Sequence, residues 1–312
     1  MRILLAKPRG FCAGVNMAID TLEQVLALVG PPVYVFHEIV HNLHVVERFK
    51  AKGAVFVGEL SEVPDGSTVV FSAHGVSPEL RREAKARALR AIDATCPLVH
   101  KVHSEASRFA RQGHTILLIG HEGHDEIIGT MGEAPERIRL VQSAAEVDTL
   151  VFPEGESLAY LSQTTLSVDD ANAIVGKLKQ RFPSIVAPPS EDICYATQNR
   201  QEAVRVLAGE ADVFLVIGSK NSSNSLRLRE IAEELGVPAY LIDSCAEVDP
   251  AWLEGKEVVA ITAGASAPED IVESCVALLQ AEYAATLEER VVRNEDMRFQ
   301  LPVELRRMLA RA

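Results

Sequence analysis

The sequence lacks any stretch approaching the roughly 20 consecutive apolar residues that cross a bilayer. It also lacks a basic excess, because 44 acidic residues against 31 Lys and Arg leave a formal net charge of -13. Proteins that bind nucleic acids generally, or membrane surfaces, need a basic face. We therefore expect neither nucleic-acid nor membrane binding, and an anionic substrate would have to be held by local donors.

The first residues, MRILLAKPRG, lack the length and cleavage pattern of a secretory signal. We therefore expect a cytoplasmic protein, in which thiols stay reduced. In such a compartment, five cysteines are more commonly ligands or core residues than disulfides. No two of them form the closely spaced pair that structural zinc sites favour.

Three of the cysteines are spread almost evenly along the chain. Cys12, Cys96 and Cys194 lie 84 and then 98 residues apart, each after a short run that suits a strand and before a helix-like stretch. Polar residues follow them at offsets of 29, 28 and 30, namely His41, His124 and Asn224. Such a matched spacing indicates an internal repeat. We expect Cys245 and Cys275, which stand outside the pattern, to be core residues.

A second set of polar loops continues the repeat. A short SEV or AEVD element precedes each loop, and the loops place His74, Thr164 and Ser266 at 62, 68 and 72 positions after the cysteines. Short apolar runs that alternate with helical stretches indicate βα units with parallel strands. Ligands of open α/β sheets bind beyond the carboxyl ends of the strands, where these loops would lie.

The pattern predicts an α/β fold of three similar lobes with parallel sheets, arranged as a pseudo-threefold trefoil around a central pocket. The predicted lobes are residues 1–97, 98–193 and 194–281, followed by a tail, 282–312, that packs on the body and ends in a helix. The sequence leaves open which lobe the first strand joins, because it could pair with the sheet of the third lobe.

Three separate cysteines are consistent with more than one kind of site. A cubane iron-sulfur cluster is ordinarily held by four thiolates, so three would leave one iron open as a Lewis acid for a substrate oxygen. Zinc bound by three cysteines and a histidine is the competing interpretation, and buried reduced cysteines are a third. An electron carrier or sensor needs no open iron and no polar pocket, so the polar loops speak against it. A zinc hydrolase acting on a diphosphate is a further alternative, which metal and sulfide analysis would separate.

The segment GHEGHDE resembles the zinc motif HExxH but has one residue too few between its histidines. Its glycine disfavours a helix, so we expect His124 and Glu126 on a loop at a strand end, suited to proton delivery. In a dry pocket a carboxyl group has a raised pKa, which favours a general acid. A solvated loop carboxylate is the alternative for Glu126.

Three small-residue loops, SAHGVS, GSKNSSNS and GASAP, are rich in hydroxyl, amide and imidazole donors. Loops of this kind suit phosphate oxygens, although none has the form of a nucleotide P-loop. The histidines outside the matched positions are expected at the surface or in the core: His37, His44, His100, His103 and His114.

Together these motifs closely resemble those of the hydroxymethylbutenyl diphosphate reductase family. The resemblance rests on PRGFCAGV, HNLHVV, SAHGVS, DATCPLVHKVH, GHEGHDEIIGTMGE, SQTTLSVDD, DICYATQNRQ, GSKNSSNS and GASAP, in order from about residue 1 to about residue 280. The tail matches only loosely, through QLPVELR.

The resemblance implies a trefoil around a 4Fe-4S cluster held by Cys12, Cys96 and Cys194, with the substrate hydroxyl at the fourth iron. The allylic diphosphate substrate would be bound through His41, His74, Ser222, Ser223, Asn224 and Ser266. His124 and Thr164 would lie near the hydroxyl, and Glu126 would supply protons. The resemblance also implies ferredoxin or flavodoxin as the electron donor. We further expect a monomer, because three lobes that close on one another have no evident need for a partner.

Overall fold

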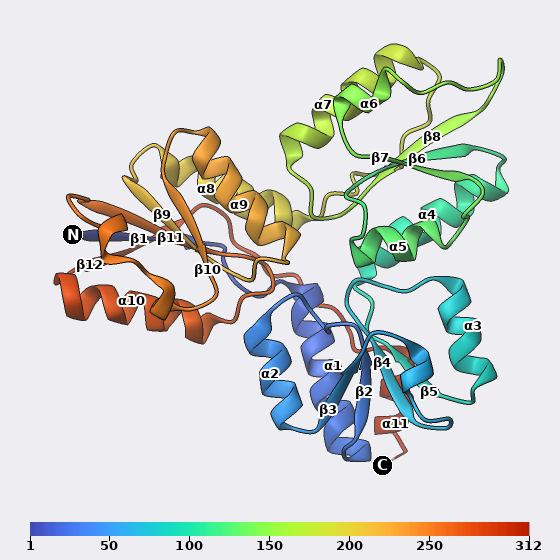
Figure 1. Ribbon diagram of the computed structural model, residues 1–312, viewed down its shortest axis with the longest axis horizontal. Helices are drawn as coiled ribbons and strands as arrows, with labels where there is room; N and C mark the ends of the chain where they lie inside the picture. The colour runs from blue at the N-terminus through green and yellow to red at the C-terminus, as the bar shows by residue number, and fades with distance from the viewer. Residues whose placement is uncertain (312) are drawn as a thin grey trace. The chain divides into compact units, whose positions relative to one another are not determined.

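A computed structural model of the chain describes residues 1–311. All paired strands are parallel, and they form three sheets (Figure 1). The five-stranded sheet has the order β10 (Ala239–Ile242), β9 (Val213–Ile217), β11 (Val258–Ala263), β1 (Arg2–Lys7) and β12 (Thr286–Val291). The four-stranded sheet has the order β3 (Ala54–Val57), β2 (Val33–Phe36), β4 (Thr68–Phe71) and β5 (Arg90–Asp93). The three-stranded sheet has the order β7 (Ile138–Val141), β6 (Thr115–Ile119) and β8 (Leu158–Ser162).

Helices connect the strands, as parallel pairing requires. The α-helices are α1 (Ala13–Val29), α2 (Leu43–Ala51), α3 (Pro78–Ala86), α4 (Pro97–Arg111), α5 (Asp125–Met131), α6 (Ala144–Val147), α7 (Val168–Arg181), α8 (Tyr195–Ala208), α9 (Ser223–Glu234), α10 (Glu269–Tyr283) and α11 (Val303–Leu309). Three short 3-10 helices are η1 (Leu60–Glu62), η2 (Cys245–Glu247) and η3 (Pro250–Trp252). Within residues 1–311, every helix is too short or too polar to span a bilayer. The predicted α/β fold of three lobes with parallel sheets is confirmed.

The chain forms two compact units. The first comprises Met1–Val15, His41–Glu47 and Tyr195–Arg298 and contains the five-stranded sheet. The second comprises Asn16–Val40, Arg48–Cys194 and Phe299–Ala312 and contains the other two sheets.

Both faces of the five-stranded sheet are covered by helices, which explains the continuous apolar runs of its central strands. Successive side chains of a strand point to opposite faces. In β9, Val213, Leu215 and Ile217 therefore pack in the cluster that includes α10. Phe214 and Val216 pack in the opposite cluster, formed with α8 and α9. Figure 1 shows α10 on one side of this sheet and α8 and α9 on the other.

The three-stranded sheet of the second unit is built in the same way. In β6, Ile116 and Leu118 pack with α4 and α5. Leu117 and Ile119 pack with α6 and α7 on the opposite face. An apolar run that is buried on both faces thus marks the central strand in each of these two sheets.

The strand orders show how the repeat is built. The three orders β10-β9-β11, β3-β2-β4 and β7-β6-β8 are equivalent, since in each the first strand along the chain lies between the other two. A fourth strand lies beside the third in two sheets: β1 beside β11, and β5 beside β4. In the three-stranded sheet, that position is occupied only by the bridge between Val186 and Ala159 of β8.

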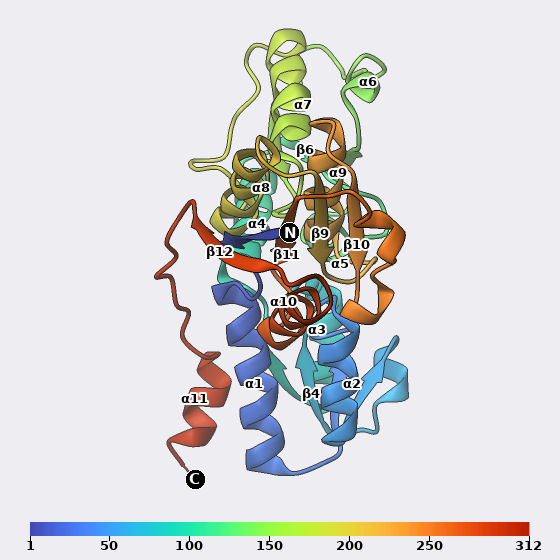
Figure 2. The ribbon, with the colours of Figure 1, turned by 90° about the vertical axis from the view of Figure 1, so that its left-hand side faces the viewer.

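This arrangement settles the question left open for the first strand, because β1 belongs to the sheet of β9, β10 and β11. It also corrects one expectation, since the segment before Cys194 forms only an isolated bridge and no strand. The tail adds β12, which runs beside β1 (Figure 2), and α11, which contacts β5 in the second unit. The residue boundaries of the three lobes stay a prediction.

Candidate functional site

The cysteines of the repeat each lie directly before a helix. Cys12 precedes α1, Cys96 precedes α4 and Cys194 precedes α8, helices of 17, 15 and 14 residues. The unpaired backbone amides at the N-terminus of a helix can donate hydrogen bonds to a ligand at this position. Each of the three is partly exposed, and in the described residues 1–311 none of the five cysteines belongs to a disulfide. The three positions therefore suit thiolate ligands.

The repeat extends to the backbone hydrogen bonds of these cysteines. The amide of Cys12 donates to the carbonyl of Ala265 at 3.1 Å. The amides of Cys96 and Cys194 donate to the carbonyls of Ala73 and Thr164, each at 3.0 Å. The acceptors belong to the loops after β11, β4 and β8, which carry Ser266, His74 and Thr164 itself. Each cysteine is thus tied to the second polar loop of its own sheet.

The predicted site residues divide between the two units. The first unit holds Cys12, His41, Ser222, Ser223, Asn224 and Ser266. The second unit holds His74, Cys96, His124, Glu126, Thr164 and Cys194. Every one of these residues except Cys194 follows the carboxyl end of a parallel strand, as predicted for the polar loops.

Glu126 is a buried acid and not a solvated loop carboxylate. Its side chain is 2% exposed. The amide of Thr164 donates to its Oε1 at 2.7 Å, and the hydroxyl of Thr164 donates to its Oε2 at 2.9 Å. Burial raises the pKa of Glu126 to about 7, although the two bonds from Thr164 lower it. The carboxyl group can therefore hold and release a proton near neutral pH.

Thr164 connects this acid to a cysteine. Its carbonyl accepts the amide of Cys194, while its own amide and hydroxyl bind Glu126. Asp192, which sequence reasoning missed, adds a second buried carboxylate close to this loop. It accepts the amide of Ser162 at 2.9 Å and pairs with Lys101 at 3.0 Å. Burial raises the pKa of Asp192, and its charge in turn raises the pKa of Glu126.

A histidine cluster lies at the start of α5. His124 caps the helix, because its Nδ1 accepts the amide of Glu126 at 3.1 Å. The segment before it is not helical, as predicted from GHEGHDE, but the prediction of a loop is wrong for Glu126, which lies in the first turn of α5 because His124 caps that helix. The ring of His124 meets that of His74 edge-on, with centroids 5.9 Å apart. The structure thus brings together four predicted residues of the second unit, since Glu126 also binds Thr164.

Asp125 and His37 join this cluster, and sequence reasoning assigned neither to the site. The carboxylate of Asp125 lies 2.7 Å from Nδ1 of His37 and 3.8 Å from Nδ1 of His74. The hydrogen bond to Asp125 raises the pKa of His37. The position of Asp125 directly before Glu126 could have indicated its place in the site. The sequence gives no such indication for His37, because its partner lies 88 positions away.

A small cavity of about 70 Å³ opens beside the same cluster. Its lining residues come from the end of β2, the loops after β2 and β4, and α3 and α5: Phe36, His37, Ser72, Gly75, Val76, Ser77, Leu80, Asp125, Ile128 and Gly129.

The polar cluster of the first unit is built from hydroxyl and amide groups. Ser222 caps α9, and its Oγ lies 3.4 Å from Oγ of Ser266. Ser266 donates to the carbonyl of His41 at 2.9 Å. Asn224 accepts the amide of Ala265 at 3.0 Å and donates to Thr197 at 3.3 Å. Ser223 is partly exposed at the first position of α9. Hydroxyl groups at the start of a 12-residue helix suit phosphate oxygens.

Two glycines allow this close packing of the loops after β9 and β11. A Cβ atom on Gly218 would lie 2.1 Å from Oγ of Ser225, and one on Gly264 would lie 2.0 Å from it. Ser225 is fully buried and donates to Oγ of Ser222 at 3.1 Å. The small residues of GSKNSSNS and GASAP therefore bring the two loops together, and the donors follow from that approach.

The two remaining cysteines lie in the core of the first unit, as expected. Cys275 is fully buried among the apolar residues of α10, and Cys245 packs against the same cluster. Burial raises the pKa of Cys275 to about 12, and the hydrogen bond to Cys245 contributes to this. The sequence showed no partner for Cys245, but the fold supplies Cys275. Neither thiol suits a ligand in that environment.

The residues present fit an iron-sulfur group. The candidate ligands are all thiols, at three equivalent positions at helix N-termini, and none belongs to a paired zinc motif. The amide of Val15 also points at Sγ of Cys12, at 3.5 Å. Hydrogen bonds of this kind to cluster sulfurs help to set the reduction potential of such groups.

Comparisons with known proteins agree on one family. Residues 3–280 match the sequence model described as LytB protein. A 4-hydroxy-3-methylbut-2-enyl diphosphate reductase from Rhodopirellula baltica is 58% identical, over 99% of this chain and 97% of its own length. The protein of the same name from an Azoarcus species is 56% identical, over 97% of each chain.

Solved structures give the same result. The structure of the E-1-hydroxy-2-methyl-but-2-enyl-4-diphosphate reductase from Plasmodium falciparum matches with a TM-score of 0.97 and 41% identity, over 99% of this chain and 98% of that one. A structure described as (E)-4-hydroxy-3-methyl-but-2-enyl diphosphate reductase, the terminal enzyme of the non-mevalonate pathway, matches with a TM-score of 0.65 and 33% identity, over 90% of this chain and 100% of that one.

Proposed function

The chain belongs to the LytB family, and we propose that it is an oxidoreductase with the activity for which its relatives are named, the reduction of 4-hydroxy-3-methylbut-2-enyl diphosphate. The reaction removes the allylic hydroxyl as water, consumes two electrons and two protons, and gives isopentenyl and dimethylallyl diphosphate. It is the last step of the non-mevalonate route to isoprenoids.

The observation that carries the proposal is the buried acid of the second unit. Both oxygens of Glu126 are bound by Thr164, and its pKa is raised to about 7. Thr164 is in turn the partner of the Cys194 amide. Glu126 delivers the proton that turns the leaving hydroxyl into water, and the hydroxyl of Thr164 relays it or orients the substrate. His124 fixes the helix turn that carries this acid through its bond to the Glu126 amide.

A LytB reductase implies an iron-sulfur cofactor. We propose a 4Fe-4S cluster held by Cys12, Cys96 and Cys194. When bound, it supplies single electrons and, at the iron without a cysteine, a Lewis acid for the substrate hydroxyl. The protein holds the three thiols directly before helix N-termini, where backbone amides can donate to ligand atoms.

The diphosphate end of the substrate is assigned to the donor-rich loops. In the first unit these donors are His41, Ser222, Ser223, Asn224 and Ser266, and in the second unit the donor is His74. With a net charge of -13, the chain cannot attract an anion by its overall field. Short-range hydroxyl, amide and imidazole donors have to supply the binding energy and to orient the substrate.

Ferredoxin or flavodoxin is proposed as the electron donor. The cytoplasm is proposed as the compartment, because partly exposed ligand thiols require a reducing environment. The chain is proposed to act as a monomer.

The test is turnover of the hydroxylated diphosphate by anaerobically purified protein with a chemical reductant. We expect labile sulfide, iron and both products. Glu126→Gln should retain the iron and lose most of the turnover. Glu122→Gln, which alters an exposed acid on the loop directly before α5, should be nearly normal. A zinc protein without sulfide, or an iron-loaded protein with no turnover, would refute the proposed function.

A further inference from the structure

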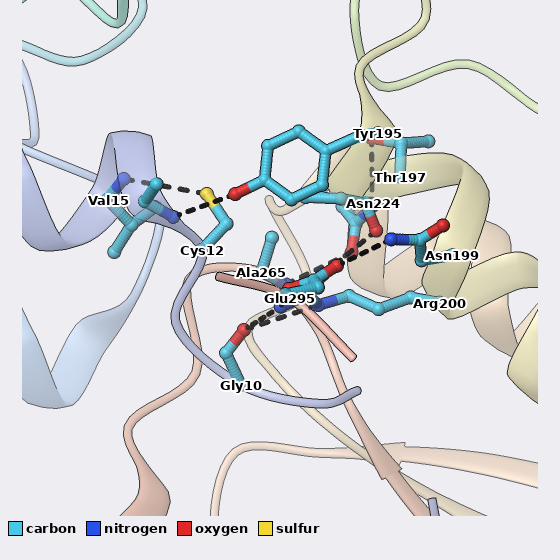
Figure 3. Close-up of polar contacts among 12 residues, drawn as sticks. Gly10, Cys12, Val15, Tyr195, Thr197, Asn199, Arg200, Asn224, Ala265 and Glu295 are labelled. Carbon is cyan, nitrogen blue, oxygen red and sulfur yellow. Dashed lines mark hydrogen bonds and ion pairs between the residues drawn. The ribbon is translucent and has the colours of Figure 1, made fainter. Parts of the chain in front are cut away.

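The loop that carries Cys12, residues 8–13, is bound through its backbone by a buried arginine of α8. Arg200 is 0% exposed, and its Nε and Nη2 donate to the carbonyl of Gly10 at 3.2 and 2.7 Å (Figure 3). Gly10 has a φ of +63°, and a Cβ atom there would lie 3.1 Å from the carbonyl oxygen of Ala267. The backbone thus approaches its neighbours at a point where only glycine fits easily.

The other contacts of this loop complete its fixation. The amides of Gly10 and Cys12 donate to the carbonyls of Ala263 and Ala265 at 3.2 and 3.1 Å. On the far side of the cysteine, the amide of Ala13 donates to the hydroxyl of Tyr195 at 3.2 Å (Figure 3). Arg9 of the loop is partly exposed and pairs with Glu269 and Glu289. Arg200 brings a fully buried charge to the loop, and this charge needs compensation.

That compensation comes from the C-terminal strap, which we define as residues 292–298. Nη1 of Arg200 lies 3.1 Å from Oε1 of Glu295, and Nη2 lies 3.3 Å from Oε2. Asn199 donates to the same carboxylate at 3.0 Å. The strap also begins beside the cysteine loop, because the amide of Val292 donates to the carbonyl of Lys7 at 2.8 Å. Residue 295 lies beyond the segment, 3–280, that matches the family model.

A buried guanidinium without a counter-ion is strongly disfavoured, and removing one partner of such a pair leaves the other charge uncompensated. Without Glu295, Arg200 would have to move toward water, and the carbonyl of Gly10 would lose both of its side-chain donors. We propose that Arg200 and Glu295 are positioning residues for Cys12, through which the C-terminal strap determines how firmly the protein retains its cofactor. The link to the cofactor rests on the proposed function, whereas the link to the loop does not.

The first experiment uses the full-length, metal-free protein. Hydrogen exchange is measured in the peptide that covers residues 9–15, since exchange reports local opening. We expect Glu295→Gln to raise the exchange rate of this peptide at least tenfold. The matched control is Glu202→Gln, which breaks an ion pair between the same helix and the same strap at 2.9 Å from Arg293, but at the surface. The control should leave exchange unchanged, and equal rates in the two variants would overturn the proposal.

The second experiment measures iron release to a chelator after anaerobic reconstitution. Glu295→Gln should lose iron about tenfold faster than wild type or Glu202→Gln. Fast exchange with normal iron retention would overturn the role in cofactor retention. A wild-type protein that takes up no iron and sulfide would instead refute the proposed function, while the exchange result would still test the loop.

A double variant separates positioning from stability. The double variant Arg200→Met with Glu295→Met removes both charges, so no buried charge remains uncompensated. Its melting temperature should therefore be closer to wild type than that of Glu295→Gln. The carbonyl of Gly10 would still lack its donors. We therefore expect exchange in residues 9–15 and iron release to stay fast in the double variant. Recovery of both together with the melting temperature would show that the pair is merely structural, and would overturn the proposal.

Discussion

Replacing Thr164 by valine should shift the proton affinity of Glu126 in a direction set by one hydrogen bond. The hydroxyl of Thr164 donates to Oε2 of Glu126 at 2.9 Å, and the backbone amide of the same residue donates to Oε1 at 2.7 Å. Valine keeps the shape of the side chain and the amide bond but removes the hydroxyl. Both bonds favour the carboxylate and so lower the pKa of Glu126, whereas burial raises it. Burial has the larger effect, and the resulting pKa is about 7. Loss of the hydroxyl bond should raise that pKa further.

The size of the shift follows from the strength of the lost bond. A hydrogen bond to a charged group contributes about 1.5–3 kcal/mol, and one pKa unit corresponds to about 1.4 kcal/mol. The protonated acid also interacts with the hydroxyl, so only part of this energy distinguishes the two forms. We therefore expect the pKa of Glu126 in Thr164→Val to rise by about one unit.

The assay is a carbon-NMR titration of carboxyl-labelled glutamate in metal-free protein, compared with the pH dependence of turnover in the reconstituted enzyme. A general acid is active when protonated, so the alkaline limb of turnover should move to higher pH by a similar amount. Thr165→Val is the control, because it removes the neighbouring hydroxyl, which accepts a bond from Nε2 of Gln163. An unchanged or lowered pKa of Glu126 in Thr164→Val would refute the assignment of that hydroxyl bond.

Three further results are expected. The folded protein binds a proton at Glu126 more tightly than the unfolded chain does, with a pKa of about 7 against 4.5. The free energy of unfolding should therefore fall as the pH rises from 4.5 to 7, by about 3 kcal/mol at most. In urea titrations, Glu126→Gln should lack this pH-dependent part of the stability. Gly264→Ala should destabilise the protein by about 1–3 kcal/mol, because its Cβ would clash with Ser225, and adding Ser225→Gly should recover much of the loss in thermal unfolding. Asp125→Asn should lower the pKa of His37, whose main cause of elevation is the bond to Asp125, and proton NMR of the imidazole would show it; a pKa that stays raised would contradict the pairing.

Much of the architecture could be predicted from local sequence, and the reason is the burial of parallel strands on both faces. Val213 to Ile217 of β9 and Ile116 to Ile119 of β6 form continuous apolar runs because each successive side chain enters one core or the other. The ends of such runs mark strand ends, so the loops that carry His74, Thr164 and Ser266 could be placed at a sheet edge without a structure.

What local sequence could not decide is which distant segments pair. The place of β1 beside β11, some 250 positions away, depends on how the apolar faces of α8 and α10 close over the sheet, and no property of residues 2–7 encodes it.

The same holds for the charges. Glu126 became a buried acid only because the loop with Thr164, 38 positions away, lies across it. The charge on Arg200 became tolerable only because Glu295, 95 positions on, reaches it. The chain sequence determined which chemical groups stand at the ends of strands and helices. Tertiary packing alone decided which of them lost water and gained a partner, because desolvation and ion pairing depend on proximity in space.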